Sequence, residues 1–409
     1  MRALVFERNV ARFAASRVAS VLVGSGRGAG VGPLRLGDLD PPEPPGPGWH
    51  RVRPLLSGIC GSDLATVDGT SSRYFEDLVS FPFVPGHEVV GVVDAVAPGT
   101  VDGVAEGTRV VLEPVIGCIP RAVDPPCSAC AEGRTGNCER VAFGQLEPGL
   151  QIGYCADTGG GWSAAGLVAH TVQLHPVPDA LSDEDAVMVE PTACAVHGAL
   201  QANVQAGDVV AVVGAGTLGL ATIAALRRFS EPGTLLAGAK HPHQRRLAEA
   251  LGADGVVTPQ QLARAVRRRT RSLAISSHLT GGADVVVDCV GSAESIAQSL
   301  AMVRPRGRVV LIGMPGRTTV DLAPLWHREV QLAGAYAYGV EDGPHGGSVR
   351  TFDLAFELVQ AAGLGRLVSA RYPLERFEEA LAHAGAAGRR GAVKVVFDVQ
   401  ARARKGQVP

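Results

Sequence analysis

The sequence lacks several features that would place it in a specialised class. Its formal net charge is only −2 at pH 7, so it has no excess charge that would attract nucleic acid or an anionic membrane. Aromatic residues make up 5%, without the stacking set that binds single-stranded nucleic acid. Every apolar run is shorter than the ~18 residues that would span a bilayer. These absences favour a globular protein that binds a small molecule, with no nucleic-acid or membrane partner.

Secretion features are also lacking. The first ten residues predict a strand, and the Gly-rich stretch 21–31 has neither the apolar core nor the cleavage site of a secretory signal. A cytoplasmic location is therefore expected, where the eight cysteines would stay reduced. Clustered thiols then indicate metal binding or catalysis rather than disulfides.

The chain has two regions that differ in their pattern of apolar residues. Two domains are expected for a length above the ~250–300 residues that a single core organises. Short apolar runs separated by Gly and Pro fill residues 1–175, which is typical of irregular β structure. Between residues 181 and 334, strand-like runs alternate with helix-like runs, which predicts an α/β, doubly wound parallel sheet. The alternating strands are expected at 209–213, 234–237, 285–289 and 309–312.

Three further segments carry structural expectations. The run 392–399 predicts a strand that returns to the β-rich region. Residues 24–48 are rich in Gly and Pro and predict an elaborated surface loop. The polar tail, residues 401–409, is expected to be disordered.

A glycine motif directly follows the first alternating strand. Gly214, Gly216 and Gly219 form G-x-G-x-x-G, with Thr217 and Leu218 between them and a helix-compatible run after them. Such glycines make the tight turn, let the backbone approach a pyrophosphate and permit close packing, while the helix N-terminus favours negative charge. The motif predicts a bound nicotinamide dinucleotide, and a glycine-rich turn without a ligand is the alternative.

Residues 237–246 bear on the choice between NAD and NADP. They contain no carboxylate where an NAD-binding fold places Asp or Glu to hold the ribose hydroxyls. Lys240, His241, Arg245 and Arg246 form a basic cluster that would attract a 2′-phosphate, so NADP(H) is favoured over NAD(H). A solvated basic start to the next helix is the alternative.

Two motifs in the β-rich region offer zinc ligands. Cys60 lies in G-I-C-G-S-D, and His87 and Glu88 lie in P-G-H-E-V-V-G. Zinc accepts thiolate, imidazole and carboxylate, and a catalytic zinc has three protein ligands. With these motifs and the glycine-rich strand–helix unit, the sequence resembles the zinc-containing medium-chain alcohol dehydrogenase family, in particular its sorbitol and threonine dehydrogenase-like branch.

The resemblance covers nearly the whole chain. It implies a GroES-like, β-rich catalytic domain over residues 1–185, a Rossmann domain over 186–334, and a return to the catalytic domain over 335–409. It implies hydride transfer between NAD(P)(H) and the alcohol or carbonyl carbon of a small molecule, with zinc polarising the oxygen. A homodimer or homotetramer is also implied.

The same resemblance assigns roles to individual residues. It implies that Cys60 and His87 are constant zinc ligands, that Glu88 lies beside or on the metal, and that Glu190 is the third ligand. Asp63 is expected to orient the histidine ligand, a role also expected on physical grounds.

The proton path departs from the family pattern. Ser62 matches the hydroxyl that passes the substrate proton toward solvent, but Ala65 stands where many relatives have the histidine that ends this path. The next acceptor is left open between water, the cofactor ribose and another base. Ala65 and the long segment 70–83 also keep open an alternative function, a redox-neutral or non-redox reaction such as dismutation or elimination on a biosynthetic intermediate.

A second thiol cluster predicts a structural zinc in a lobe at about 113–140. Cys127, Cys130 and Cys138 match the last three cysteines of the family's C-x2-C-x2-C-x7-C set, and Asp124 occupies the place of the first. Either Asp124 or Cys118 completes the set, and Cys118 is favoured because thiolates dominate closed structural sites. This zinc would fold the lobe and take no part in the chemistry.

Overall fold

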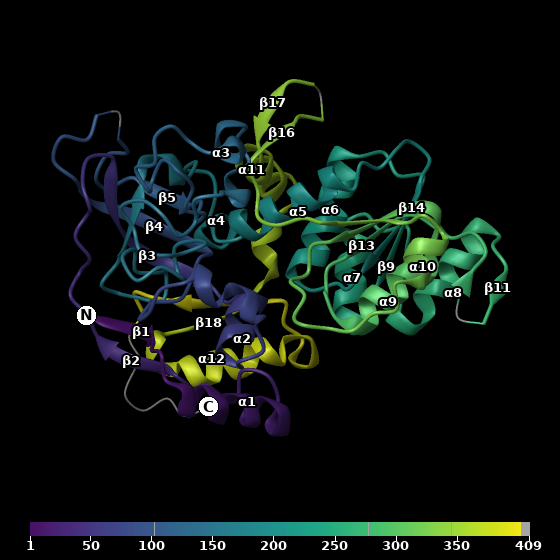
Figure 1. The fold of residues 1–409 in the computed structure, drawn as a ribbon, viewed down its shortest axis with the longest axis horizontal. Helices are drawn as coiled ribbons and strands as arrows, with labels where there is room; N and C mark the ends of the chain where they lie inside the picture. Colours follow the sequence, from purple (N-terminus) through teal and green to yellow (C-terminus); the bar gives the residue numbers. More distant parts are fainter. Residues whose placement is uncertain (102, 277, 345, 402–409) are drawn as a thin grey trace. The chain divides into compact units, whose positions relative to one another are not determined.

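The computed structural model describes residues 1–101, 103–276, 278–344 and 346–401 (Figure 1). The tail expected to be disordered, residues 401–409, lies outside these ranges except for Ala401. Among the described residues, no helix combines the length and the apolar composition that a membrane crossing requires. The chain folds into two compact units, one formed by Met1–Glu190 with Gly365–Pro409 and the other by Pro191–Leu364.

The first unit is built on a mixed seven-stranded sheet. The strand β19 (Lys394–Asp398), from the C-terminal segment, pairs antiparallel with β3 (Trp49–Gly58), so an early and a late segment of the chain share one sheet, as the run 392–399 predicted. Alternating buried side chains of β3 and β4 explain why these runs form strands with a packed face. The order is β18 (Val368–Tyr372), β19 (Lys394–Asp398), β3 (Trp49–Gly58), β4 (Val89–Val96), β5 (Arg109–Leu112) and β7 (Leu174–Pro176), with β6 (Leu167–His170) on β3.

The N-terminal region differs from the expected all-β structure. Between β1 (Arg2–Phe6) and β2 (Leu34–Asp38), which pair antiparallel, lies helix α1 (Val10–Val23). The expected surface loop at 24–48 is also wrong in part, because it contains β2 and packs Ala29 and Leu34 in the core. A Cβ on Gly26 would lie 2.1 Å from the carbonyl oxygen of Leu381, so glycine permits close packing there rather than loop freedom.

The second unit contains the predicted parallel sheet. All five strand pairs run parallel. The sheet face formed by Ala211 and Val213 packs on two helices, α8 (Pro259–Thr270) and α9 (Ala293–Met302), through Leu262, Val266 and Ile296. The strand order is β10 (Gly255–Val257), β9 (Thr234–Gly238), β8 (Val209–Val213), β13 (Ala283–Asp288), β14 (Val303–Leu311) and β15 (Gln331–Gly334). The helices are α5 (Val189–Gln201), α6 (Thr217–Phe229), α7 (Pro242–Ala250), α8 (Pro259–Thr270), α9 (Ala293–Met302) and α10 (Ala323–His327).

This unit continues beyond residue 334, where the sequence analysis placed its end. The chain adds a hairpin of β16 (Val340–Asp342) and β17 (Ser348–Arg350), followed by α11 (Thr351–Ala362), which packs on α6. Phe352, Leu358 and Val359 bury one face of α11. The remaining elements are α2 (Gly61–Val67), α3 (Ser128–Ala131), α4 (Asp183–Ala186) and α12 (Phe377–Gly385) in the first unit, and the pair β11 (Ala274–Ile275) and β12 (His278–Leu279) in the second.

Candidate functional site

Three potential metal ligands meet at one end of the first unit's sheet. Cys60 follows β3 and caps α2, and His87 and Glu88 immediately precede β4. Because β3 and β4 pair antiparallel with Ser57 opposite Val89, the end of one strand lies beside the start of the other. The ligand atoms of Cys60, His87 and Glu88 lie within 4.8 Å of one another, and the last two residues are buried. Sulfur, imidazole nitrogen and carboxylate oxygen at this spacing fit a zinc ion.

Asp63 connects the cysteine and the histidine. One of its carboxylate oxygens accepts a 2.9 Å hydrogen bond from the Cys60 backbone N–H, and the other lies 3.5 Å from His87 Nδ1. Burial lowers the pKa of His87, but Asp63 and Cys60 raise it, and the net result is a pKa well above the usual value of 6.5. The carboxylate thus orients the imidazole with its other nitrogen available to a metal.

Tyr154, which the sequence analysis did not assign, completes the buried surroundings of Asp63. Its hydroxyl donates a 3.2 Å hydrogen bond to Asp63 Oδ1, and its ring centroid lies 5.9 Å from that of His87. Burial, with the nearby charge of Asp63, raises the pKa of Tyr154 well above 10, so the hydroxyl is neutral. Ser62, in the first turn of α2, is close enough to this hydroxyl to lower its pKa.

Lys394 is a second residue that sequence reasoning missed. It lies at the start of β19, and its ammonium pairs with Glu88 and donates to the Ile59 carbonyl oxygen at 3.3 Å. The side chains of Lys394 and Glu88 are only 2% and 1% exposed. Burial lowers the pKa of Lys394, but Glu88 raises it, with Cys60 and Glu190 adding to that effect, to above 10.5. A lone lysine in a buried strand was the signal that could have found it.

Two other positions define the space around this pair. A Cβ on Gly58 would lie 1.8 Å from a Glu88 carboxylate oxygen, so only glycine leaves room for the ion pair. Glu190, in the first turn of α5, is buried and close enough to Lys394 to affect its pKa. Its carboxylate nevertheless lies outside the group of described ligand atoms, from Cys60, His87 and Glu88, that are within 4.8 Å of one another.

The glycine motif has the geometry of a dinucleotide site. Gly214, directly after β8, has φ +92°, and a Cβ on Gly219 would lie 2.0 Å from the Gly214 carbonyl oxygen. Gly216 caps α6, and a Cβ there would meet nothing within 4 Å. Thr217 and Leu218 form the first turn of α6, next to this open surface. The bare helix N-terminus fits a pyrophosphate.

The basic cluster follows β9, the strand next to β8. Lys240 is exposed, and His241 caps α7 with its ring 5.9 Å from that of His243. The Arg245 guanidinium donates to the carbonyl oxygens of Ala239 and Lys240, both at 3.2 Å. The loop after β9 thus presents cationic groups at the same sheet end as the glycine motif.

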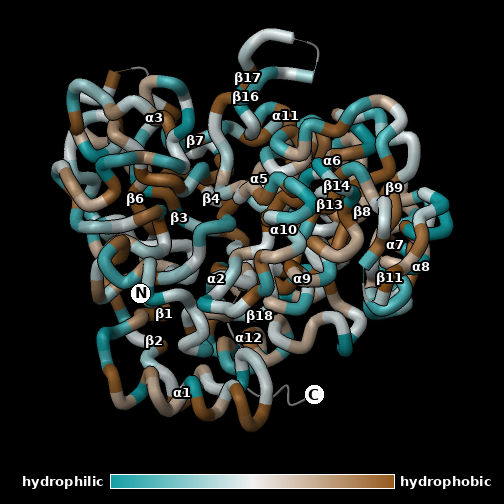
Figure 2. The backbone as a smooth tube through the Cα atoms, turned by 45° about the vertical axis from the view of Figure 1, so that its right-hand side comes forward, coloured by the Kyte–Doolittle hydropathy of each residue, from teal (hydrophilic) through white to brown (hydrophobic). Residues whose placement is uncertain are grey.

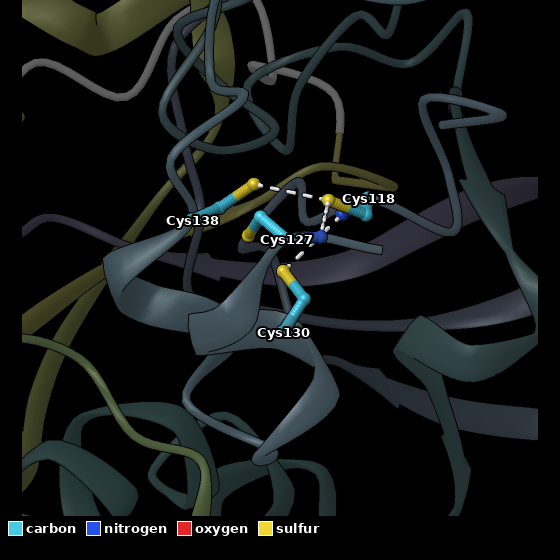
Figure 3. Close-up of side chains that lie close together, drawn as sticks. All are labelled: Cys118, Cys127, Cys130 and Cys138. Carbon is cyan, nitrogen blue, oxygen red and sulfur yellow. Dashed lines mark hydrogen bonds between the residues drawn. The ribbon is translucent and has the colours of Figure 1, made fainter. Parts of the chain in front are cut away.

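Four cysteines come together in the predicted lobe. The sulfur atoms of Cys118, Cys127, Cys130 and Cys138 lie within 4.8 Å of one another (Figure 3). Asp124, the alternative ligand, is exposed and lies outside this group. Figure 3 shows the four side chains converging on one point from the loop before α3, from α3 itself and from the segment after it.

Backbone N–H donors surround these sulfurs, although burial raises the pKa of Cys138 to about 11 and also raises that of Cys130. Each sulfur accepts at least one backbone N–H, at 3.4 or 3.5 Å. Burial raises the pKa of Cys127, but the N–H donors of Cys130 and Glu139 lower it, to about 7 overall. A site with four thiols and one donor for each sulfur is typical of a structural zinc.

Arg121 holds the lobe together and was not predicted. It is fully buried and donates to five backbone carbonyl oxygens, the shortest contact being 2.6 Å to Gly149. Burial lowers the pKa of Arg121. One planar guanidinium therefore satisfies several loop carbonyls that regular structure leaves unpaired.

Comparisons with known proteins agree with this geometry. The family profile described as "Alcohol dehydrogenase GroES-like domain" matches residues 46–179, and "Zinc-binding dehydrogenase" matches residues 217–368. L-idonate 5-dehydrogenase of Vitis vinifera is 30% identical over 361 residues, 87% of this chain and 89% of that one. Sorbitol dehydrogenase of Arabidopsis thaliana is 30% identical over 358 residues, with the same shares.

A solved structure extends the comparison to a bound cofactor. A zinc-binding dehydrogenase from Sinorhizobium meliloti, bound to NADP, has a TM-score of 0.68 and 27% sequence identity. The match covers 89% of this chain and 95% of that one. The similarity thus includes both the β-rich unit and the parallel-sheet unit.

Proposed function

This chain belongs to the zinc-containing medium-chain alcohol dehydrogenase family and is a zinc-dependent, nicotinamide-dependent oxidoreductase acting on a small alcohol or carbonyl compound; we propose how its own residues perform this reaction. The observation that carries the proposal is the meeting of Cys60 and His87 at one end of the sheet, with the buried carboxylates of Glu88 and Glu190 near them. When bound, zinc supplies a Lewis acid for the substrate oxygen and the nicotinamide exchanges hydride with the substrate carbon.

We assign the catalytic zinc ligands as Cys60, His87 and Glu190, with Glu88 held beside them. Turning Glu88 toward a metal would leave Lys394 as an unpaired buried cation, which is costly. Glu190 is buried, acidic and near the same ion pair, and it matches the family's third-ligand position. In this assignment Glu88 and Lys394 remain paired, and their charges influence the electrostatic potential at the zinc site.

Zinc content per chain separates the two carboxylates. Glu190→Gln is expected to lose the catalytic zinc, so that one zinc per chain remains out of the two that the two ligand groups would hold. The double change Glu88→Met with Lys394→Met removes the ion pair as a unit and is expected to keep both ions. If the double variant loses zinc and Glu190→Gln keeps it, Glu88 is the ligand.

For the proton released on alcohol oxidation, we propose a hydroxyl path in place of the missing histidine. The Tyr154 hydroxyl interacts with Ser62 and lies 3.4 Å from Thr66 Oγ1. Thr66 Oγ1 in turn lies 3.3 Å from Ser71 Oγ, and Ser71 is partly exposed. Each hydroxyl donates its one proton while accepting another. The chain can therefore pass a proton from Ser62 outward past Ala65 once the Tyr154 proton turns from Asp63 to Thr66 and the Thr66 proton turns from the Ser62 carbonyl oxygen to Ser71.

Substitution of the two middle hydroxyls tests this path. Tyr154→Phe and Thr66→Val are each expected to lower the rate of alcohol oxidation by about tenfold or more, because one positioned proton-transfer group is lost. Zinc content and NADPH affinity should stay unchanged, and small amine buffers should restore part of the rate. Full activity in both variants would show that Ser62 delivers its proton elsewhere.

We propose NADP(H) as the preferred cofactor. Lys240 and Arg245 follow the strand next to the glycine motif, and residues 237–246 contain no acid that would repel a 2′-phosphate. The similar structure from Sinorhizobium meliloti binds NADP, which supports this choice.

For the substrate, we propose a secondary alcohol of a compound with several hydroxyl groups. The relatives at 30% identity are named for L-idonate and sorbitol, which share this chemistry. To test this substrate class, the zinc-loaded enzyme is given NADP and each member of a panel of sugar alcohols and sugar acids, and NADPH formation is measured by absorbance. Reaction with simple alcohols only would contradict the substrate class but leave zinc-dependent oxidation intact.

We also propose that the chain forms a homodimer in the cytoplasm, where its cysteines would stay reduced. β15 lies at one end of the parallel sheet, and Leu332 and Tyr336 beside it are exposed, as is Trp326 at 80%. An edge strand with exposed apolar side chains is suited to pairing with a copy of itself. Light scattering that gives a single-chain mass would contradict the dimer.

A further inference from the structure

Helix α1 exposes the face that a surface helix normally buries. Val10, Val21 and Leu22 are 82%, 74% and 76% exposed, and Val18 is 58% exposed. With Ala14, they follow the i, i+3, i+4 spacing that places residues on one helix face. In Figure 2 the tube of α1 carries brown segments at the lower margin of the view, and in Figure 1 the same helix lies below α12. We call this set the α1 apolar face.

The opposite face of α1 is polar because it binds the end of α2. Ser16, the buried residue of α1, donates through its hydroxyl to the Val67 carbonyl oxygen at 2.5 Å. Arg17 donates to the Gly69 carbonyl oxygen at 3.0 Å, and Ser20 to that of Asp68 at 3.3 Å. The carbonyl oxygens at the C-terminus of α2 have no N–H donor from a further helical turn, and these contacts satisfy them. The helix is therefore held in place with its apolar face turned outward.

The segment of sequence that contains α1 is rich in arginine. Five arginines and no acidic residue lie between positions 8 and 37, although the net charge of the chain is −2. By helical spacing Arg17 lies at one edge of the α1 apolar face, whereas Arg12 lies nearer Ser16 on the inward side and is half-buried. The five are Arg8, Arg12, Arg17, Arg27 and Arg35.

From this combination we propose that α1 binds the surface of an anionic lipid bilayer. An apolar helix face with exposed arginines nearby, here Arg8, Arg17 and Arg27, lies in the interface plane, with the apolar side chains at the acyl-chain boundary and the guanidiniums on lipid phosphates. A second copy of the same helix fits less well, because arginines would meet arginines. The segment lies before residue 46, where the match to the family begins, and contains none of the residues assigned to the metal and cofactor sites.

Vesicle co-sedimentation of the zinc-loaded, full-length protein tests the proposal. One set of vesicles contains equal parts of phosphatidylglycerol and phosphatidylcholine, and the other contains phosphatidylcholine alone. The test variant is Val18→Ser with Leu22→Ser on α1. The matched control is Leu273→Ser with Ile275→Ser, because these side chains are also 71% and 67% exposed but lie far from α1 in sequence. Thermal unfolding of both variants verifies that they fold.

The unchanged protein is expected to sediment with the anionic vesicles, to be released by high salt and to remain in solution with phosphatidylcholine alone. The α1 variant should bind the anionic vesicles about tenfold or more weakly, because it loses the apolar part of two side chains, whereas the control should bind normally. Absence of binding to anionic vesicles, or equal binding by the α1 variant, overturns the proposal. A fall in oligomer mass on substitution of Val18 and Leu22, without vesicle binding, overturns it in favour of a second copy.

Discussion

Lys394→Met tests the buried ion pair behind the proposed catalytic zinc. The change keeps a long side chain in β19 but removes the ammonium, which leaves the buried Glu88 carboxylate without its cation. Breaking one partner of a buried pair costs about 3–5 kcal/mol. At about 2–4 °C per kcal/mol for a unit of this size, the unfolding midpoint should fall by roughly 6–20 °C. The double variant with Glu88→Met removes both charges and should recover most of this loss.

Differential scanning calorimetry of the zinc-loaded single and double variants measures the effect. A midpoint for Lys394→Met within about 2 °C of the unchanged protein would refute the reasoning, because it would mean that water or metal already compensates Glu88. A double variant no more stable than the single one would show that packing in β19, and not charge, determines the cost.

Three other predictions concern the remaining sites. Cys130→Ser should lose the structural zinc and lower soluble yield, while Cys60→Ser abolishes turnover with the fold intact; equal yield and zinc content for Cys130→Ser would contradict the lobe assignment. Burial lowers the pKa of His50 below 6.5, so the unfolded chain binds the proton first and stability, complete above pH 6.5, declines as pH falls. His50→Gln should flatten the drop in unfolding midpoint between about pH 7.5 and about pH 5.5, and an unchanged drop would exclude His50 as its source. Lys240→Asp should weaken NADPH binding by about tenfold while leaving NADH nearly unaffected, and unaltered NADPH fluorescence titrations would show that the cluster is solvated surface.

Local patterns predicted much of the fold because they report directly on backbone requirements. The strand–glycine–helix pattern at Gly214–Gly219 depends on positive φ and on close packing, which only glycine permits. The run at 392–399 is apolar on a strand period and became β19, paired with β3. The cysteine spacing indicated Cys127, Cys130 and Cys138, whereas Cys118 was favoured over Asp124 because thiolates dominate closed structural sites.

What the sequence did not predict depends on contacts between distant segments. Lys394 meets Glu88 only after β19 pairs with β3, and Tyr154 reaches Asp63 across 91 positions of sequence. Helix α1 escaped prediction because its inward face is polar, so the usual apolar stripe toward a core does not exist. The role of Arg121 could not be predicted either, because its partners are backbone carbonyl oxygens of loops distant in sequence.

Alcohol-dependent cofactor reduction tests the central claim most directly. The zinc-loaded enzyme, given a polyol and NADP, is followed by absorbance of NADPH, then stripped of zinc with a chelator and measured again. Stoichiometric NADPH formation that disappears with the metal and returns on adding zinc is the predicted result. Conversion of the substrate without net NADPH formation would contradict it and would favour the redox-neutral reaction.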